Sequence, residues 1–215
     1  MKKGQIILFT GPSCAGKNTV VEALLKALPN AKRLITTTTR QPRPGEQNGI
    51  DYHFVTPEVF EHQRRRGDFL EYAENYGNWY ATSMRTIEEM RTQHDYVFMI
   101  LDVQNGAPAI RRAYPDARIF GITTEDFGII EERLVTARNW TPRELVRRAV
   151  EAYKEFNILL SEGHAYGVDI VFQNAQGDGK LERLVETIRL MILGNHPIQN
   201  IMSTFSGSPQ ESSLF

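Results

Sequence analysis

This sequence of 215 residues is poor in three features, and each scarcity excludes a class of protein. Its single cysteine, Cys14, cannot form a disulfide within the chain. No apolar run approaches the roughly 18 residues that a membrane-spanning helix needs. Lysine plus arginine (25) nearly balance aspartate plus glutamate (26), so no overall positive field attracts nucleic acid or an anionic membrane. Any site for an anion must therefore be local.

The remaining composition is that of an ordinary globular protein. Hydrophobic residues make up 41% of the sequence and charged residues 24%, and the length suits one domain with a sizeable core. The first residues, Met-Lys-Lys-Gly-Gln, lead into an apolar run without the apolar core of a signal peptide. We therefore expect a cytoplasmic protein with neither nucleic acid nor membrane as a partner.

The order of apolar patterns indicates an α/β fold. Strand-like runs lie at residues 6–10, 96–101, 117–122 and 168–172, and helical periodicity lies at 19–28, 107–113, 127–137, 142–160 and 181–193. Such alternation predicts a parallel sheet flanked by helices on both faces. Residues 33–82 break the rhythm with short polar and aromatic pieces, which favours an inserted subdomain at about 34–90. Residues 195–215 have no periodicity and are expected to form a flexible tail after a domain of residues 1–194.

A glycine-rich segment joins the first strand to the first helix. Its residues are Gly11, Pro12, Ser13, Cys14, Ala15, Gly16, Lys17, Asn18 and Thr19. The pattern Gly-x4-Gly-Lys at such a junction is typical of a phosphate-binding loop, or P-loop, in which backbone N–H groups and a lysine bind the phosphates of ATP. A plain strand-to-helix turn is the alternative explanation.

Asn18 departs from the P-loop pattern, which has serine or threonine after the lysine to ligate Mg²⁺. We therefore assign no metal ligand directly. Mg²⁺ is expected as a cofactor that arrives with ATP and is bound through nucleotide phosphates and water, with the Asn18 amide oxygen as the candidate protein ligand.

The segment after residue 33 is rich in groups that bind a phosphate monoester. Arg40 and Arg43 are three residues apart, Tyr52 follows, and Tyr80 lies further along the chain. Two guanidinium groups and two phenolic hydroxyls suit a phosphate dianion. A solvated charged surface would explain the same residues, so this pattern alone leaves the function open.

Three blocks of sequence resemble the guanylate kinase family, whose members transfer phosphate from ATP to GMP in purine nucleotide metabolism. They are residues 37–55, which begin Thr-Thr-Thr-Arg-Gln-Pro-Arg, residues 67–72 (Gly-Asp-Phe-Leu-Glu-Tyr) and residues 77–82 (Gly-Asn-Trp-Tyr-Ala-Thr). With the P-loop, the resemblance spans about residues 4–190. It implies a P-loop kinase fold in which the insert binds the acceptor nucleotide and a helical lid at about 125–160 closes over the site.

The resemblance also implies a role for particular residues. Arg40, Arg43, Tyr52 and Tyr80 would bind the GMP phosphate. Glu71 would accept the guanine N1–H and 2-amino group, with Thr36 and Thr82 beside the base. Asp102 would lie near the acceptor, and Asn174 near the adenine of ATP. The residues implied in catalysis are Lys17, Arg43, Arg133 and Arg148.

Two further positions depart from the family pattern. Ala137 stands where a lid arginine is expected, with Arg138 one residue later, and Ile100 stands where the family has a second aspartate. These departures, together with Asn18, leave two alternatives open: a P-loop kinase for another phosphorylated acceptor such as a sugar phosphate, and a nucleotide-binding module with weakened catalysis. The expected partners are ATP and GMP or dGMP, and the expected assembly is a monomer or homodimer.

Overall fold

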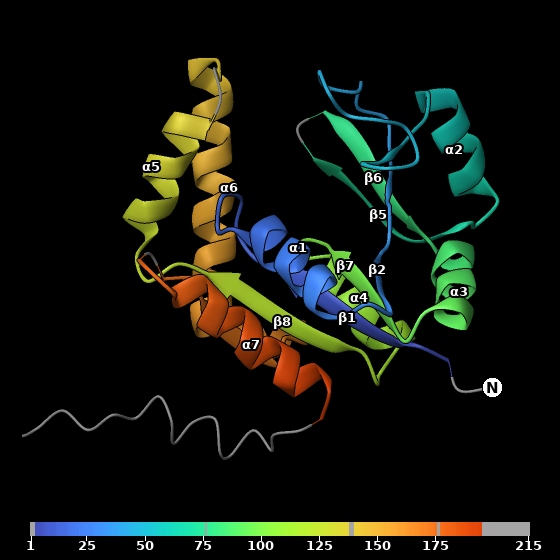
Figure 1. Cartoon of the computed structure of the whole chain (residues 1–215). Helices are drawn as coiled ribbons and strands as arrows, with labels where there is room; N and C mark the ends of the chain where they lie inside the picture. The colour runs from blue at the N-terminus through green and yellow to red at the C-terminus, as the bar shows by residue number, and fades with distance from the viewer. Residues whose placement is uncertain (1–2, 76, 138–139, 176, 195–215) are drawn as a thin grey trace, which may run out of the picture.

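A five-stranded parallel sheet forms the centre of the molecule (Figure 1), which a computed structural model describes for residues 3–75, 77–137, 140–175 and 177–194. The strand order is β2-β7-β1-β8-β9, and every neighbouring pair is parallel. The strands are β1 (Gln5–Thr10), β2 (Ala31–Arg33), β7 (Tyr96–Ile100), β8 (Arg118–Thr123) and β9 (Ile170–Gln173). This sheet confirms the predicted α/β class.

Helices cover both faces of this sheet. Successive side chains of a strand point to opposite faces, and in β1 the side chains on both faces are apolar and need a covering layer. Along β1, Ile7 and Phe9 pack in the layer of α1 and α7, whereas Ile6 and Leu8 pack in the layer of α3, α4 and α6. The bounds of these helices are α1 Lys17–Ala27, α3 Met84–Gln93, α4 Gly106–Ala113, α6 Pro142–Ser161 and α7 Lys180–Ile192, and a short 3₁₀ helix, η1, spans Gly163–Tyr166.

A second, four-stranded sheet stands above the first and has the order β4-β3-β6-β5. Its strands are β3 (Thr37–Thr38), β4 (His53–Phe54), β5 (Phe69–Asn75) and β6 (Asn78–Ser83). Helix α2 (Pro57–Arg65) packs on it through Phe60, whose ring lies 4.9 Å from that of Phe69 and 6.0 Å from that of Trp79.

Helices α5 (Phe127–Ala137) and α6 stand together on the other side of the molecule from the second sheet (Figure 1). They share a small apolar core of their own, made by Ile130, Leu134, Ala152 and Phe156. Thr141 starts α6 with a capping box, in which its side chain and that of Glu144 each bond the other's backbone N–H.

The four predicted strands and five predicted helices are all present, with ends shifted by up to two residues. Strand β2 and helices α2 and α3 were not predicted, because each buries too few residues to give a periodic pattern: Ala31 in β2, Phe60 in α2 and Ile87 in α3. The predictions for Arg138 and for the tail at 195–215 concern residues outside the described ranges. In the described part of the chain, no helix combines the length and apolar character needed to span a membrane.

Candidate active site

The loop between β1 and α1 requires glycine at two positions. Gly11 and Gly16 have φ angles of 134° and 90°, which residues other than glycine rarely adopt. A Cβ atom at Gly11 would lie 2.1 Å from the Ile122 carbonyl oxygen, and one at Gly16 would lie 2.2 Å from the Asn174 Nδ2 atom. The loop therefore approaches the ends of the parallel strands too closely for any larger residue.

Two side chains from distant elements hold the carbonyl groups of this loop. Asn174, which follows β9 and is 8% exposed, donates from Nδ2 to the Ala15 carbonyl oxygen at 2.9 Å. Arg133, from α5, donates from Nη1 to the Cys14 carbonyl oxygen at 3.0 Å. Both residues thus brace the P-loop from outside.

Lys17 is the first residue of α1 and folds back over the loop. Its Nζ atom donates to the carbonyl oxygens of Gly11 (2.5 Å) and Pro12 (2.8 Å). Burial lowers the pKa of Lys17, and the negative charge of Glu155 opposes that change. The ammonium group is therefore held against the first two residues of the loop.

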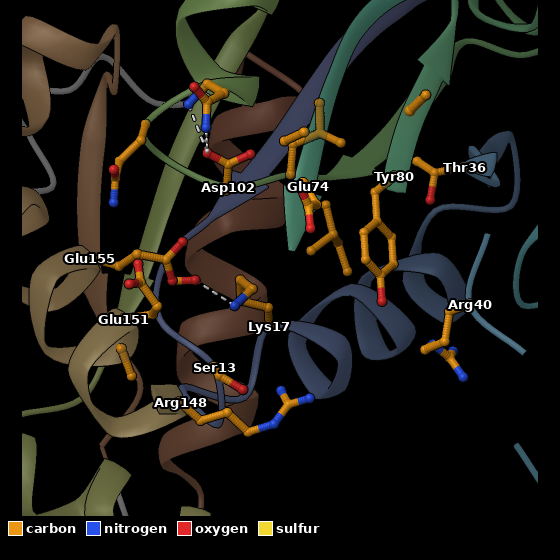
Figure 2. Close-up of a pocket in the computed structure, with 18 of the residues that line it drawn as sticks. Ser13, Lys17, Thr36, Arg40, Glu74, Tyr80, Asp102, Arg148, Glu151 and Glu155 are labelled. Carbon is orange, nitrogen blue, oxygen red and sulfur yellow. Dashed lines mark hydrogen bonds between the residues drawn. The ribbon is translucent and has the colours of Figure 1, made fainter. Parts of the chain in front are cut away.

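A cleft of about 660 Å³ opens between the P-loop, the second sheet and α6. In Figure 2, Lys17, Asp102 and Glu155 lie on one side of it, and Tyr80, Thr36 and Arg40 on the other. Eleven residues implied from the sequence line the cleft: Gly11, Ser13, Lys17, Thr36, Arg40, Arg43, Tyr52, Glu71, Tyr80, Asp102 and Arg148. The other implied residues lie outside this lining: Pro12, Cys14, Ala15, Gly16, Asn18, Thr19, Thr82, Arg133 and Asn174.

Glu46 links Arg40 and Arg43 in the segment between β3 and β4. Its Oε1 atom accepts from Arg40 Nη2 at 2.9 Å, and its Oε2 atom accepts from the Arg43 backbone N–H at 2.8 Å. The hydrogen bond from Arg40 holds the pKa of Glu46 below its usual range. The Arg40 guanidinium also covers the rings of Tyr52 (5.3 Å) and Phe54 (5.6 Å). Arg40 is therefore fixed by an acid and two aromatic rings.

Glu71 is a carboxyl group of β5 that accepts a hydrogen bond from the neighbouring strand. The antiparallel pairing of β5 and β6 sets it opposite Thr82, whose hydroxyl donates to Glu71 Oε1 at 2.6 Å. Burial raises the pKa of Glu71 to about 7; the Thr82 hydrogen bond opposes this shift, and the charge of Asp102 adds to it. In its ionised form the group can accept further hydrogen bonds from a ligand that brings its own donors.

Asp102 lies two residues after the end of β7 and is held by Asn105. Its Oδ1 atom accepts from the Asn105 backbone N–H at 2.7 Å and from the Asn105 side chain at 3.2 Å. Its position is the one expected of ligand-binding groups in open α/β sheets, at the carboxyl end of a central strand.

Helix α6 contributes cleft residues that the sequence reasoning missed. These residues are Glu151 and Glu155, which line the cleft beside Arg147 and Arg148. Burial raises the pKa of Glu155 to about 7, and the nearby Lys17 ammonium works against that shift. Charges four residues apart share one face of a helix, but the sequence did not show that this face of α6 turns toward Lys17. Asn105, Gln104 and Glu74 also line the cleft without having been predicted.

Among the residues that the structure describes, no group of three His, Cys, Asp or Glu side chains is arranged to hold a metal ion. Asn18 is exposed near the start of α1. An ion with a shell of phosphate oxygens and water needs no such group, so the site fits Mg²⁺ that is bound mainly by a nucleotide.

Comparison with known proteins gives a consistent result. A family model described as guanylate kinase matches residues 3–190. The guanylate kinase of Symbiobacterium thermophilum is 35% identical over 191 residues, which are 89% of this chain and 85% of that protein. The guanylate kinase of Cupriavidus metallidurans is 38% identical over 185 residues, 86% of this chain and 82% of that protein.

A solved structure shares the fold. The crystal structure of guanylate kinase from Anaplasma phagocytophilum superposes with a TM-score of 0.68 at 23% identity, and the match covers 91% of this chain and 87% of the other. The likeness supports the P-loop kinase fold predicted from the sequence.

Proposed function

The chain belongs to the guanylate kinase family, and we propose how its cleft carries out the reaction of that family, the transfer of the γ-phosphate of ATP to GMP or dGMP. The protein is a phosphotransferase, and its substrates are nucleotides. The observation that supports the proposal is that one cleft has Lys17 of a P-loop on one wall and Arg40, Tyr80 and Glu71 on the other.

The P-loop is the proposed site for the ATP phosphates. The positive end of α1 and the N–H groups of residues 11–19 suit a polyphosphate. Lys17 rests on two loop carbonyls, and we infer that it turns from them to the phosphates when ATP binds. Asn174 and Arg133 support this end by holding the Ala15 and Cys14 carbonyls, which keeps the loop in shape.

The second sheet is the proposed site for GMP. Arg40, Arg43, Tyr52 and Tyr80 line one cleft and offer donors for a phosphate dianion. Glu71 would accept from the guanine N1–H and 2-amino group, with Thr36 and Thr82 beside the base. Adenine offers no such pair of donors, so a buried acceptor would discriminate strongly between the two bases.

Transfer itself requires an oxygen of the GMP phosphate to attack the γ-phosphorus as the bond to the ADP oxygen breaks. The protein's task is to align the two groups and to balance the charge that develops. We assign this charge compensation to Lys17, Arg43 and Arg148, which line the cleft, and to Arg133, which bonds the P-loop at the Cys14 carbonyl.

Enzymes of this class use ATP with a divalent metal ion, and Mg²⁺ is the proposed ion. When bound, it would neutralise charge on the phosphate oxygens. The Asn18 amide oxygen is the protein group proposed to meet it, with water and phosphates as the other ligands. We also propose the domain limits 1–194, with an acceptor insert at about 34–90 and a lid at about 125–160. A cytoplasmic location and a monomeric or homodimeric state stay predictions from the sequence.

The comparisons favour GMP over a sugar phosphate as acceptor, and transfer over binding alone. The direct test measures ADP formation from Mg-ATP with GMP, dGMP, AMP, UMP or no acceptor, with the Lys17→Met variant as background. We expect ADP formation that depends on GMP or dGMP and disappears in the variant. ADP formation that is equal with all acceptors would contradict the proposal.

A further inference from the structure

The guanidinium of Arg148 lies over the ring of Trp140. The Cζ atom of Arg148 is 4.0 Å from the centroid of that ring, well within the range of a cation–π contact. Trp140 precedes the Thr141 cap of α6, whereas Arg148 lies two turns further along the same helix. The contact therefore joins the start of α6 to a residue that lines the cleft.

Trp140 is itself fixed in place. Its Nε1–H donates to the Leu134 carbonyl oxygen at 2.9 Å, near the end of α5. Leu134 is 1% exposed and belongs to the apolar core that α5 shares with α6. The indole ring is thus tied to both helices, and it offers the arginine a rigid surface.

Stacking on the indole ring restricts the conformations of the Arg148 side chain. Figure 2 shows its side chain reaching from α6 past Ser13 of the P-loop. A free arginine side chain samples many rotamers, and a planar guanidinium that stacks on an aromatic ring loses that freedom before the substrate arrives.

We infer that Trp140 is a positioning residue for Arg148: its indole holds the guanidinium at the edge of the cleft, ready to meet the phosphoryl group in transfer. The inference rests on the proposed function, since it assigns Arg148 to that reaction. It gives the Trp140 ring the role of orienting the Arg148 guanidinium, which is distinct from capping α6 or filling the apolar core.

The test compares Trp140→Ala, Trp140→Phe, Arg148→Ala and the double variant Trp140→Ala/Arg148→Ala in ADP formation with GMP. Trp140→Ala should lower kcat roughly tenfold and leave both KM values within about threefold, because an aligned charge acts mainly on the transition state. Trp140→Phe keeps an aromatic face and should retain most of kcat. In the Arg148→Ala background, removal of the indole should have little further effect.

Tyr153→Ala is the matched control, since Tyr153 is an exposed aromatic residue of α6 whose ring packs on Phe127. It should leave kcat within about twofold of the wild type. The inference is overturned if Trp140→Ala leaves kcat unchanged. It is also overturned if the loss is as large in the Arg148→Ala background as in the wild type, because the indole would then act through folding of the lid.

A second measurement needs no activity. The sequence has two tryptophans, so Trp79→Phe leaves Trp140 as the sole indole fluorophore. Replacing Arg148 by alanine should uncover the ring and raise its acrylamide quenching constant, whereas Tyr153→Ala should not. An acrylamide quenching constant that stays the same in the Arg148→Ala variant would contradict the contact between Arg148 and Trp140. A wild-type protein that forms no GMP-dependent ADP would instead remove the proposed function, while quenching still decides whether Arg148 covers Trp140.

Discussion

The two walls of the cleft are built in different ways. On the P-loop wall the backbone sets the shape: Gly11 and Gly16 approach the strand ends, and the carbonyls of the loop are held by Asn174 and Arg133. On the wall made by the second sheet, pairs of side chains set the shape, as in Glu71 with Thr82. The first construction suits a phosphate chain common to all nucleotides, and the second suits recognition of one base.

The difference predicts separable functions. Changes on the P-loop wall should abolish transfer to every acceptor and leave GMP binding nearly intact. Changes on the wall of the second sheet should weaken GMP recognition and leave the use of ATP intact. The following variants test this separation, beginning with the largest expected effect.

Lys17→Met should have the largest effect on turnover. The substitution removes the ammonium group proposed to balance charge on the transferring phosphoryl group, so kcat should fall by about a thousandfold or more. Steady-state ADP formation measures this loss, and circular dichroism checks the fold. Lys26→Met, an exposed lysine in the last turn of the same helix, is the control and should keep wild-type turnover. Near-normal turnover of Lys17→Met would refute the role.

Glu71→Gln should have the next largest effect, and its effect should depend on the acceptor. The amide replaces one carboxylate oxygen by an NH2 donor, which would face a guanine donor, so kcat/KM for GMP should fall roughly a hundredfold. The matched control is Glu74→Gln, an exposed neighbour in the same strand that also lines the cleft. If kcat/KM for GMP fell equally in the two variants, the loss would come from removing a negative charge from the cleft and not from the position of Glu71.

The pH dependence of GMP use should follow Glu71, because its pKa lies at about 7. Above pH 7 the group is a carboxylate and accepts from guanine; below pH 7 it gains a proton and loses that capacity. The kcat/KM for GMP of the wild type, relative to Glu71→Gln, should therefore drop about tenfold from pH 8 to pH 6. Taking this ratio cancels the titration of the GMP phosphate and of Glu155. A ratio that is constant with pH would contradict the assignment.

Asn18→Ser should have the smallest effect. A hydroxyl is the usual metal ligand at this position of a P-loop, so the Mg²⁺ concentration for half-maximal activity should decrease about two- to fivefold. A titration of Mg²⁺ at fixed ATP measures it. Asn157→Ser, at an exposed site on α6, serves as the control. An unchanged Mg²⁺ requirement would show that Asn18 is no weaker a ligand than serine.

Local sequence signals predicted the parts of the fold that carry periodic apolar residues. The P-loop, four strands of the parallel sheet and five helices were predicted in this way. Helix α2 was missed because Phe60 is its one buried residue, although Thr56 as a cap and Pro57 at the first position were visible in the sequence.

The relations between distant residues were beyond the reach of sequence patterns. The contact between Asn174 and Ala15 joins residues that are 159 positions apart in the sequence. It forms because the P-loop follows the carboxyl end of β1 and Asn174 follows the carboxyl end of β9, and these ends lie on the same side of the parallel sheet. Likewise, Glu155 faces the cleft because α6 crosses beside Lys17, a packing that charge spacing alone did not indicate. The resemblance to the family supplied candidate residues, and the fold supplied their neighbours.

The most direct test of the two-wall account is calorimetric binding of GMP, without ATP, to the wild type, Lys17→Met and Glu71→Gln. The account predicts that Lys17→Met binds GMP within about twofold of the wild type, while Glu71→Gln binds it roughly fiftyfold or more weakly. If Lys17→Met lost GMP binding as strongly as Glu71→Gln, or if Glu71→Gln bound GMP normally, the separation of the two walls would be contradicted.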